Sequence, residues 1–150
     1  MYKRKNYIIA HKSVFPISFH DTDAMGVVWH GNYIKFFELA REAMFYALGY
    51  DYKNMKEENI IYPITECSCK YRKPLLVTDK TISVLCMLTE YDGKIEINYE
   101  VYGGNNKTLC AYGKTQQVAV NTLTNEIQIC TPSNLVNAIL EYEKKNGKNY

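Results

Sequence analysis

The sequence predicts an α+β fold in which one long apolar helix packs against a single antiparallel sheet. An apolar stripe of helical period begins after Asn32 and predicts the helix. Between residues 60 and 128, several strand-like segments are separated by turn signals and predict the sheet. A strand, then a long helix, then about four antiparallel strands is an order typical of α+β proteins with one sheet.

The N-terminal part is predicted to contain a single strand. Residues 1–12 are basic and polar, and we expect a loose arm there. Residues 14–19 are predicted to form the first strand. The apolar side chains on one face of it are Phe15, Ile17 and Phe19. Because Pro16 lacks the N–H that a sheet ladder needs, this strand is expected at a sheet edge, or Pro16 near its end.

The long helix is predicted to run from Asn32, a suitable N-cap, to Gly49, a suitable residue to end it. The apolar stripe consists of Tyr33, Phe36, Phe37, Ala40, Ala43, Met44, Ala47 and Leu48. The other half of the helix also carries apolar residues, namely Ile34, Leu39, Phe45 and Tyr46. We therefore expect a second cover over this helix, from sheet curvature or from another subunit.

The later elements follow from turn signals and alternation. We expect a short exposed turn or helical extension at 51–59, strands at 60–72, 80–91, 94–102 and 107–120, and a final helix at 132–145. Asp92-Gly93 is a hairpin signal. In the strand at 94–102, Ile95, Ile97, Tyr99 and Val101 are predicted inward, and Lys94, Glu96, Asn98 and Glu100 outward.

One strand is predicted to be covered on both faces. Residues 84–88, VLCML, are apolar throughout, which indicates cover by the helix on one face and by something else on the other. Because one sheet face has to bury the long helix, we expect the sheet to curl around it, which is the layout of the hotdog fold.

Composition limits the class of protein. The length suits one domain over residues 1–150, and 47% hydrophobic with 23% charged residues is typical of a soluble globular chain. A net charge of +2 does not indicate a nucleic-acid partner. No apolar run is as long as a membrane span, and the N-terminus lacks a signal-peptide pattern, so we expect a cytoplasmic protein. The 5 cysteines lack metal-ligand spacing and are expected to be reduced.

The loop before the long helix is the candidate site. Residues 21–32, DTDAMGVVWHGN, contain two carboxylates, a permissive glycine and a histidine. The first N–H groups of a helix have no partners within it and point toward such a loop. Hydrolysis of a carbonyl compound needs a base or nucleophile near the carbon and donors near the oxygen. The loop has both, although a carboxylate at a helix start is often only a turn or dipole partner.

This loop and helix resemble the signature of the hotdog acyl-CoA thioesterases of the 4-hydroxybenzoyl-CoA thioesterase type. The matching residues are Asp21-Thr22-Asp23-Ala24-Met25-Gly26-Val27-Val28-Trp29-His30, Tyr33, Phe36-Phe37-Glu38 and Arg41. The run Tyr71-Arg72-Lys73-Pro74 before a strand is compatible with the same family. Met25 departs from the pattern, since a small residue is more usual there, and it is expected to narrow the loop or pocket.

The resemblance implies that Asp23 is catalytic, attacking the thioester carbonyl or activating a water. It also implies that backbone N–H groups polarise the carbonyl oxygen, and we expect them between Val28 and Gly31. His30 is the second catalytic candidate and would hydrogen-bond the substrate, a water or Asp23; its alternative role is structural. The substrate-binding candidates are Gly26, Val28, Trp29, Gly31 and Tyr33. Gly26 and Tyr33 also suit plain conformational and core roles.

The other acidic residues near the loop have alternative roles. Asp21 is expected to brace the loop. Glu38 is the fallback acid, because related hotdog enzymes use a helix acid; otherwise it pairs with Arg41 one helical turn later. An apolar acyl tunnel or a plain core is indicated by Phe36, Phe37, Met44, Tyr71 and Tyr99.

The resemblance implies an acyl-CoA or acyl-carrier-protein substrate and no metal or organic cofactor. Arg72 and Lys73 are the candidate contacts to coenzyme A phosphates, with Lys70, Lys80 and Lys114 as further basic residues near strand ends. The resemblance also implies a homodimer or homotetramer with the site at a subunit boundary. An exposed sheet edge favours such pairing.

Two other functions remain open at this point. The hotdog fold also occurs in hydratases and dehydratases of acyl thioesters, which use a histidine with an acid, and here His20 and His30 are near the loop. A non-catalytic module that binds acyl thioesters or an acyl-carrier protein is the third class.

Overall fold

The computed structural model describes residues 1–105 and 107–147, so residues 106 and 148–150 of the predicted domain lie outside the described part. Its elements are β1 (Ile9–Pro16), α1 (Asn32–Ala47), α2 (Tyr52–Glu57), β2 (Ile60–Ile61), β3 (Ile64–Tyr71), β4 (Thr81–Glu90), β5 (Ile95–Tyr102), β6 (Leu109–Gln117), β7 (Val120–Asn121) and α3 (Ser133–Asn146). Short 3-10 helices occupy Phe19–Asp21 and Val77–Asp79.

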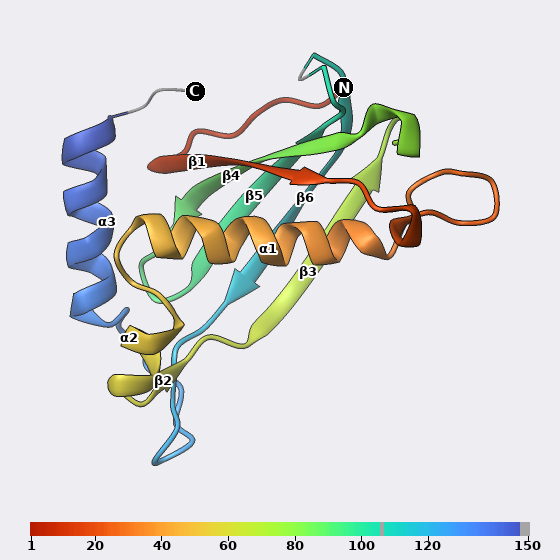
Figure 1. The fold of residues 1–150 in the computed structure, drawn as a ribbon. Coiled ribbons are helices and arrows are strands. Elements are labelled where there is room, and N and C mark those ends of the chain that lie inside the picture. The colour runs from red at the N-terminus through yellow and green to blue at the C-terminus, as the bar shows by residue number, and fades with distance from the viewer. Residues whose placement is uncertain (106, 148–150) are drawn as a thin grey trace.

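One antiparallel sheet wraps around one long helix. The strand order is β1-β4-β5-β6-β3, and β2 and β7 form a separate short pair. Figure 1 shows α1 lying along the sheet, with α3 standing beyond its C-terminal end. This arrangement is the predicted hotdog layout, and the α+β fold class is confirmed.

The buried face of α1 follows the predicted stripe, with two exceptions. Its buried members include Phe36, Phe37, Ala40 and Met44. Ala47 is exposed, whereas Phe45, which the sequence placed on the opposite half, is buried. The reason is a second contact surface, because the Phe45 ring stacks at 6.4 Å on Tyr62, which follows β2.

The sequence predicted a capping residue at each end of α1. Gly49 has a φ of +74°, and its N–H donates to the Tyr46 carbonyl while the Tyr50 N–H donates to the Phe45 carbonyl, which is a Schellman motif. The predicted helix end is therefore confirmed. The N-cap is Gly31 rather than Asn32, which is the first helical residue. The Asn32 side chain donates to the Asp21 carbonyl at 2.8 Å and ties the helix start to the loop.

The loose N-terminal arm is a wrong prediction. Strand β1 begins at Ile9, and the Ile8 N–H donates to the Leu88 carbonyl at 2.8 Å. Tyr7 forms a small second core on the outer sheet face with Leu85 and Met87. The chain itself thus contributes the second cover that the apolar run at 84–88 required. Strand β1 also ends at Pro16, and Phe19 lies exposed beyond it.

The outward face of β5 is also covered, contrary to the prediction. Its inward residues Ile97 and Tyr99 are buried as expected, but Glu96 is buried as well and Glu100 is only 1% exposed. The Glu100 carboxylate accepts hydrogen bonds from Arg4, Tyr2 and Tyr102. Burial alone would raise the Glu100 pKa, but these three donors hold it below its ordinary value.

The strand predicted at 60–72 consists of two strands. Pro63 separates β2 from β3, and β3 is an edge strand whose side chains are mostly exposed. The strand predicted at 107–120 likewise divides into β6 and β7. The strands predicted at 80–91 and 94–102 are confirmed as β4 and β5, and the final helix as α3.

Candidate active site

Asp21 lies at the start of the loop between the first 3-10 helix and α1, and its bonds fix both the start and the end of that loop. The Asp21 carboxylate is buried, forms an ion pair with Lys35 and accepts from the Ser18 N–H at 2.8 Å. Its carbonyl accepts from the Trp29 N–H at 2.9 Å. Burial alone would raise the pKa of Asp21, but Lys35 and the Ser18 N–H hold it below its ordinary value. Asp21 is thus the brace that the sequence predicted.

Asp23 has one carboxylate oxygen engaged and one open. Its Oδ1 accepts from the Met25 N–H at 2.8 Å and from the Val27 N–H at 3.3 Å. Within the described residues, Oδ2 has no hydrogen-bond partner. Gly26 has a φ of +76°, and a Cβ at this position would have no atom within 4 Å, so the role of Gly26 in this turn is conformational. The turn therefore fixes the position of the carboxylate through Oδ1 and leaves Oδ2 available.

A cleft of about 340 Å³ opens beside Asp23. It is lined by Asp23, Val27, Val28, His30, Tyr33, Tyr71, Arg72, Lys73 and Pro74. The loop, the start of α1 and the end of β3 therefore converge on one space. Most of the predicted site residues lie here, but Gly26, Trp29, Gly31 and Glu38 are not among the lining residues.

Two backbone donors at the start of α1 are open. The Val28 N–H donates to the Leu75 carbonyl and the Trp29 N–H to the Asp21 carbonyl. Within the described residues, the N–H groups of His30 and Gly31 have no acceptor. The predicted range of oxyanion donors thus narrows to these two groups, which precede a helix whose dipole favours negative charge.

The side chain of Trp29 packs over the backbone of Gly31. A Cβ on Gly31 would lie 2.3 Å from the Trp29 ring, so any larger residue at this position has to displace the indole. The indole is 50% exposed, and its ring centroid is 5.1 Å from that of His30. These two predicted binding residues therefore shape the helix start beside the cleft rather than line it.

The histidine and the two tyrosines of the cleft form an aromatic group. The Tyr33 ring meets the Tyr71 ring edge-on at 5.0 Å, and the Tyr71 hydroxyl donates to the His30 carbonyl at 2.8 Å. No hydrogen bond joins the His30 ring to Asp23 in the described structure. Burial raises the pKa of Tyr71 to about 12 and also raises that of Tyr33. The sequence assigned Tyr71 only to a tunnel or core, although the run from Tyr71 to Pro74 was a signal for the site.

The fallback acid and its predicted partner lie apart from this cleft. Glu38 is exposed, and none of the ion pairs in the described structure joins it to Arg41. Arg41 instead donates to the Tyr99 hydroxyl at 3.2 Å, because the guanidinium turns toward the sheet. The predicted Glu38–Arg41 pair is therefore wrong.

The basic residues near the strand ends divide into two groups. Arg72 and Lys73 line the cleft, and both of their backbone N–H groups donate to the Cys110 carbonyl, at 2.7 and 3.0 Å. Lys70 and Lys114 instead line a separate cavity of about 410 Å³ under the N-terminal arm. Lys114 is also paired with Glu66 at 3.0 Å. Arg72 and Lys73 are therefore the two of these basic residues that line the Asp23 cleft.

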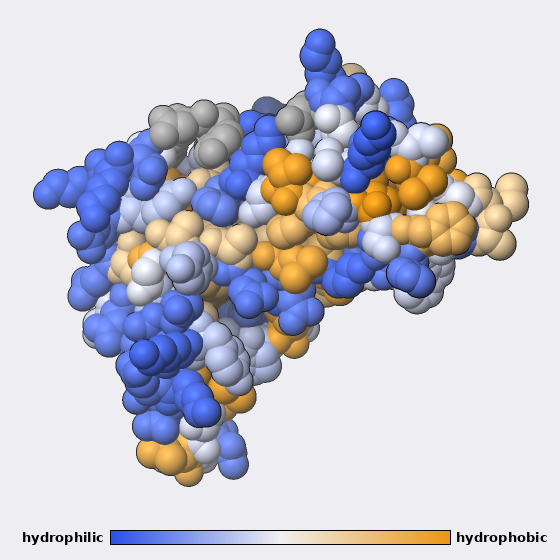
Figure 2. Space-filling view, in the orientation of Figure 1, coloured by the Kyte–Doolittle hydropathy of each residue, from blue (hydrophilic) through white to orange (hydrophobic). Residues whose placement is uncertain are grey.

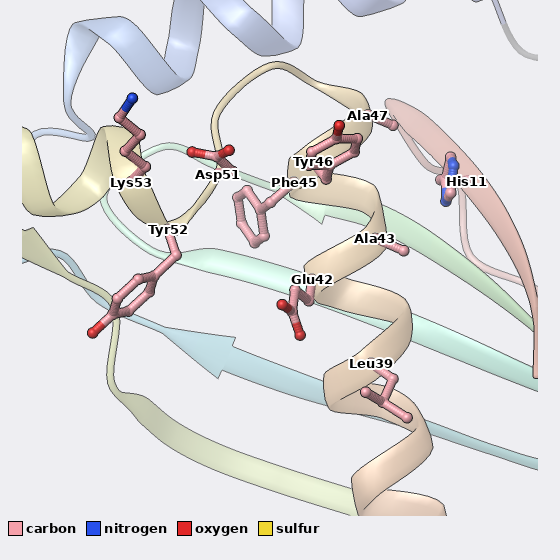
Figure 3. A pocket seen from close by; sticks show the side chains of 10 residues that line it. All are labelled: His11, Leu39, Glu42, Ala43, Phe45, Tyr46, Ala47, Asp51, Tyr52 and Lys53. Carbon is pink, nitrogen blue, oxygen red and sulfur yellow. The ribbon is translucent and has the colours of Figure 1, made fainter.

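A larger cavity of about 550 Å³ lies at the other end of α1. Figure 3 shows Leu39, Glu42 and Tyr46 of α1 beside His11 of β1 and the start of α2. Burial lowers the pKa of His11, and its Nδ1 lies 3.4 Å from the Ser13 hydroxyl. The helix that begins at this cavity, α2, is capped by the Asp51 side chain, which accepts from the Asn54 N–H at 3.2 Å, so we place the candidate site at the smaller cleft.

Among the described residues, no three His, Cys, Asp or Glu side chains are grouped to hold a metal ion. The described helices include none long and apolar enough to cross a membrane. All 5 cysteines are free thiols.

The chain matches the thioesterase-like superfamily over residues 17–140. A 1,4-dihydroxy-2-naphthoyl-CoA hydrolase of Rippkaea orientalis is 32% identical over 112 residues, which cover 73% of this chain and 81% of the relative. The acyl-CoA thioester hydrolase YbgC of Escherichia coli is 26% identical over 115 residues, 75% of this chain and 73% of the relative. The protein therefore belongs to the thioesterase-like superfamily.

Structural similarity extends over nearly the whole chain. The DHNA-CoA thioesterase of Staphylococcus aureus has a TM-score of 0.80 at 23% identity, covering 94% of this chain and 97% of that one. This likeness concerns the fold. The aligned segments span 66% and 49% of the length of two further relatives, from Bacillus subtilis and Aquifex aeolicus.

Proposed function

We propose that the protein hydrolyses acyl-CoA thioesters to a free acid and coenzyme A. The observation that carries this proposal is the open Oδ2 of Asp23 beside a cleft that is also lined by His30, whose N–H is open. The names of the relatives as acyl-CoA hydrolases support the same reaction.

Asp23 acts as a general base or as a nucleophile. As a base, Oδ2 takes a proton from a water whose oxygen attacks the thioester carbon. As a nucleophile, Oδ2 itself attacks, and water then cleaves the resulting anhydride. In both routes the carbonyl oxygen gains negative charge, and the carbon–sulfur bond breaks with the electron pair leaving on sulfur. The open His30 N–H at the helix start stabilises the oxyanion, and one such donor is worth about 3 kcal/mol.

The remaining cleft residues position the substrate. His30, Val28 and Tyr33 contact the thioester end, and Gly26, Trp29 and Gly31 shape the loop and helix start around it. Arg72 and Lys73 contact the phosphates of coenzyme A, because cationic side chains at a cleft mouth suit phosphate. Hydrolysis of an acyl-carrier-protein thioester would follow the same steps and would use the same residues at the thioester. We place this enzyme in the cytoplasm, as one domain over residues 1–150 of the 4-hydroxybenzoyl-CoA thioesterase type.

The enzyme works as a homodimer or homotetramer. Two surfaces support this. The edge strand β3 has exposed side chains along its length, and α1 has exposed apolar residues on its outer face, including Ile34 and Leu39. Figure 2 shows an apolar band across the middle of this face of the molecule, with hydrophilic residues above and below it. A subunit paired at β3 would lie next to Tyr71 and hence next to the cleft.

The test is release of free thiol from a panel of acyl-CoAs, followed with a disulfide reagent. Asp23→Asn removes the base or nucleophile with little change in size, and we expect kcat to fall by about 10²–10⁴-fold. Asp92→Asn, in the exposed β4–β5 hairpin, is the matched control and should retain wild-type turnover. Turnover that survives Asp23→Asn would exclude the assigned role.

The same panel separates the other two functions. Hydration of an enoyl-CoA without thiol release would identify a hydratase. Tight binding of acyl-CoA with no reaction at any chain length would identify a binding module. An acyl-carrier-protein thioester, tested beside the coenzyme A thioester of the same acyl group, distinguishes the two carriers.

A further inference from the structure

The cavity of about 410 Å³ under the N-terminal arm is strongly basic. Four lysines from two distant parts of the chain line it. They are Lys3 and Lys5 of the arm, Lys70 of β3 and Lys114 of β6. Among the described residues, no acidic side chain lines this cavity.

The strand register forms the floor of the cavity. Asn98 of β5 lies opposite Lys114, which in turn lies opposite Ser68 of β3. In the next row, Tyr112 lies opposite Lys70. Because side chains alternate along each strand, these five point to the outer sheet face, away from α1. The sheet therefore holds two lysines and two hydroxyl groups on one surface.

Two of the four lysines have an acidic partner and two do not. Lys5 lies 3.4 Å from Glu96, and Lys114 lies 3.0 Å from Glu66 and 3.9 Å from Glu96. Within the described residues, the other two lysines form no ion pair. Like charges that converge on one cavity repel one another, and an anion between them offsets that repulsion.

The arm is held over the sheet without a ligand. Tyr2 and Arg4 both donate to the buried Glu100, so Lys3 and Lys5 of the same segment are held at the cavity. The lysines of the arm and of the sheet are thus brought together before anything binds. A site formed in advance avoids much of the entropy cost of ordering its side chains on binding.

We propose that this cavity binds a ligand that carries a nucleoside diphosphate group. Ammonium groups bind phosphate oxygens through charge-assisted hydrogen bonds, and the hydroxyl groups of Ser68 and Tyr112 add neutral donors. The volume lies in the range of small-molecule sites and leaves room for more than the phosphates. The Tyr112 ring, which lies 4.3 Å from that of Tyr2, gives the cavity an aromatic wall.

Calorimetric titration with ADP tests the site. At about 0.15 M salt the wild type should bind ADP, and the affinity should fall as salt screens the charges. Lys70→Gln removes an exposed, unpaired lysine, and we expect ADP binding to weaken about tenfold or more. Lys145→Gln, on α3 and outside the cavity, is the matched control and should bind ADP as the wild type does. Equal ADP affinity in the wild type and Lys70→Gln would overturn the proposal.

Amide resonances locate the bound nucleotide. Gly113 lines the cavity, whereas Gly26 lies in the turn beside Asp23. We expect ADP to shift the Gly113 resonance and to leave that of Gly26 in place. A shift of Gly26 with Gly113 unmoved would put the nucleotide at the Asp23 cleft and overturn the proposal. Absence of any shift at millimolar ADP would mean that the lysines are only solvated, which also overturns it.

Coenzyme A also contains a nucleoside diphosphate group, and titration of the Gly113 resonance separates the two sources. Tighter binding of coenzyme A than of ADP at Gly113 would identify coenzyme A as the ligand, and the reverse order a free nucleotide; both results support the site. Since none of these measurements uses turnover, they decide the proposal independently of the proposed hydrolysis.

Discussion

Asp21 and Asp23 are two positions apart but have opposite environments. Asp21 is buried against Lys35 and holds the loop, whereas Asp23 is exposed at the cleft and keeps one oxygen open. A carboxylate that is fully engaged cannot take up a proton easily, since its partners stabilise the charged form. The two acids of the loop therefore divide into a structural residue and the residue for which we propose the chemical role.

Replacing Asp21 should destabilise the fold in a pH-dependent way. Its folded pKa lies below the ordinary value, so its stabilising effect is complete above the unfolded pKa of about 3.9 and is lost as the pH falls through the folded pKa. We expect Asp21→Asn to lower the free energy of unfolding by about 2 kcal/mol at pH 7. Urea unfolding at pH 7 and pH 3 should show the difference from wild type shrinking at pH 3. An equal difference at both pH values would contradict the assignment.

Glu38 should be dispensable for turnover. It is exposed on α1 and lies outside the residues that line the cleft. Surface substitutions change free energies by about 0.5 kcal/mol or less, so Glu38→Gln should keep kcat within about twofold of wild type. Steady-state kinetics on the best acyl-CoA of the panel measures this. A loss as large as that of Asp23→Asn would transfer the role of the acid to the helix.

The junction between the loop and α1 is the element on which the site depends. Its first turn is not capped by a side chain, because the N-cap is glycine and Asn32 binds the loop instead. An uncapped start leaves N–H groups available to a ligand, at some cost in helix stability. The absence of a side-chain cap here is thus consistent with the oxyanion role proposed for these groups.

Gly31→Ala should disturb this junction in a way that fluorescence can follow. The new Cβ would meet the Trp29 ring at 2.3 Å, so the indole has to move away from the helix start. Trp29 is the single tryptophan of the chain, and its emission should shift to the red as it becomes more exposed. We expect kcat to fall in parallel. Gly103→Ala, whose new Cβ would meet no atom closer than 3.5 Å, is the control for emission and kcat. Unchanged emission in Gly31→Ala would contradict the packing described.

The whole molecule differs from a bare sheet around a helix because the N-terminal arm covers the outer sheet face. The arm is held by Tyr7 in the second small core and by the bonds of Tyr2 and Arg4 to Glu100. A carboxylate that is 1% exposed is stable there only with such partners. The outer face over β4 and β5 is therefore occupied by the chain itself.

Arg4→Ala should lower the free energy of unfolding, because it weakens the attachment of the N-terminal arm to the outer sheet face. Losing a partner of a buried charge costs about 3–5 kcal/mol, and we expect about 2 because Arg4 is partly exposed and both tyrosine donors remain. Since the folded pKa of Glu100 is lowered by these partners, the loss should be largest at neutral pH and shrink as Glu100 becomes protonated. Denaturant unfolding measures it, with Lys3→Ala in the same arm as control. An equal loss in both variants would contradict the role of the ion pair.

Local patterns in the sequence were sufficient for the helices, for the strands β4 and β5, and for the loop that contains Asp23. These features depend on residue spacing within one element, and Asp92-Gly93 and Gly49 mark ends that local backbone geometry controls. Strand limits were less accurate where Pro63 divides one apolar run into β2 and β3. The single domain over residues 1–150 and the arrangement of subunits stay predictions.

The sequence by itself determined the layout of the fold and the position of the candidate loop, because periodic apolar residues can be buried in only one way by a helix or a strand. Only the tertiary structure decided which groups are buried, bonded or open. Glu100 is held by residues 96 and 98 positions away, and Tyr71 reaches His30 across 41. Such contacts depend on where the strands lie in space, which no local pattern specifies.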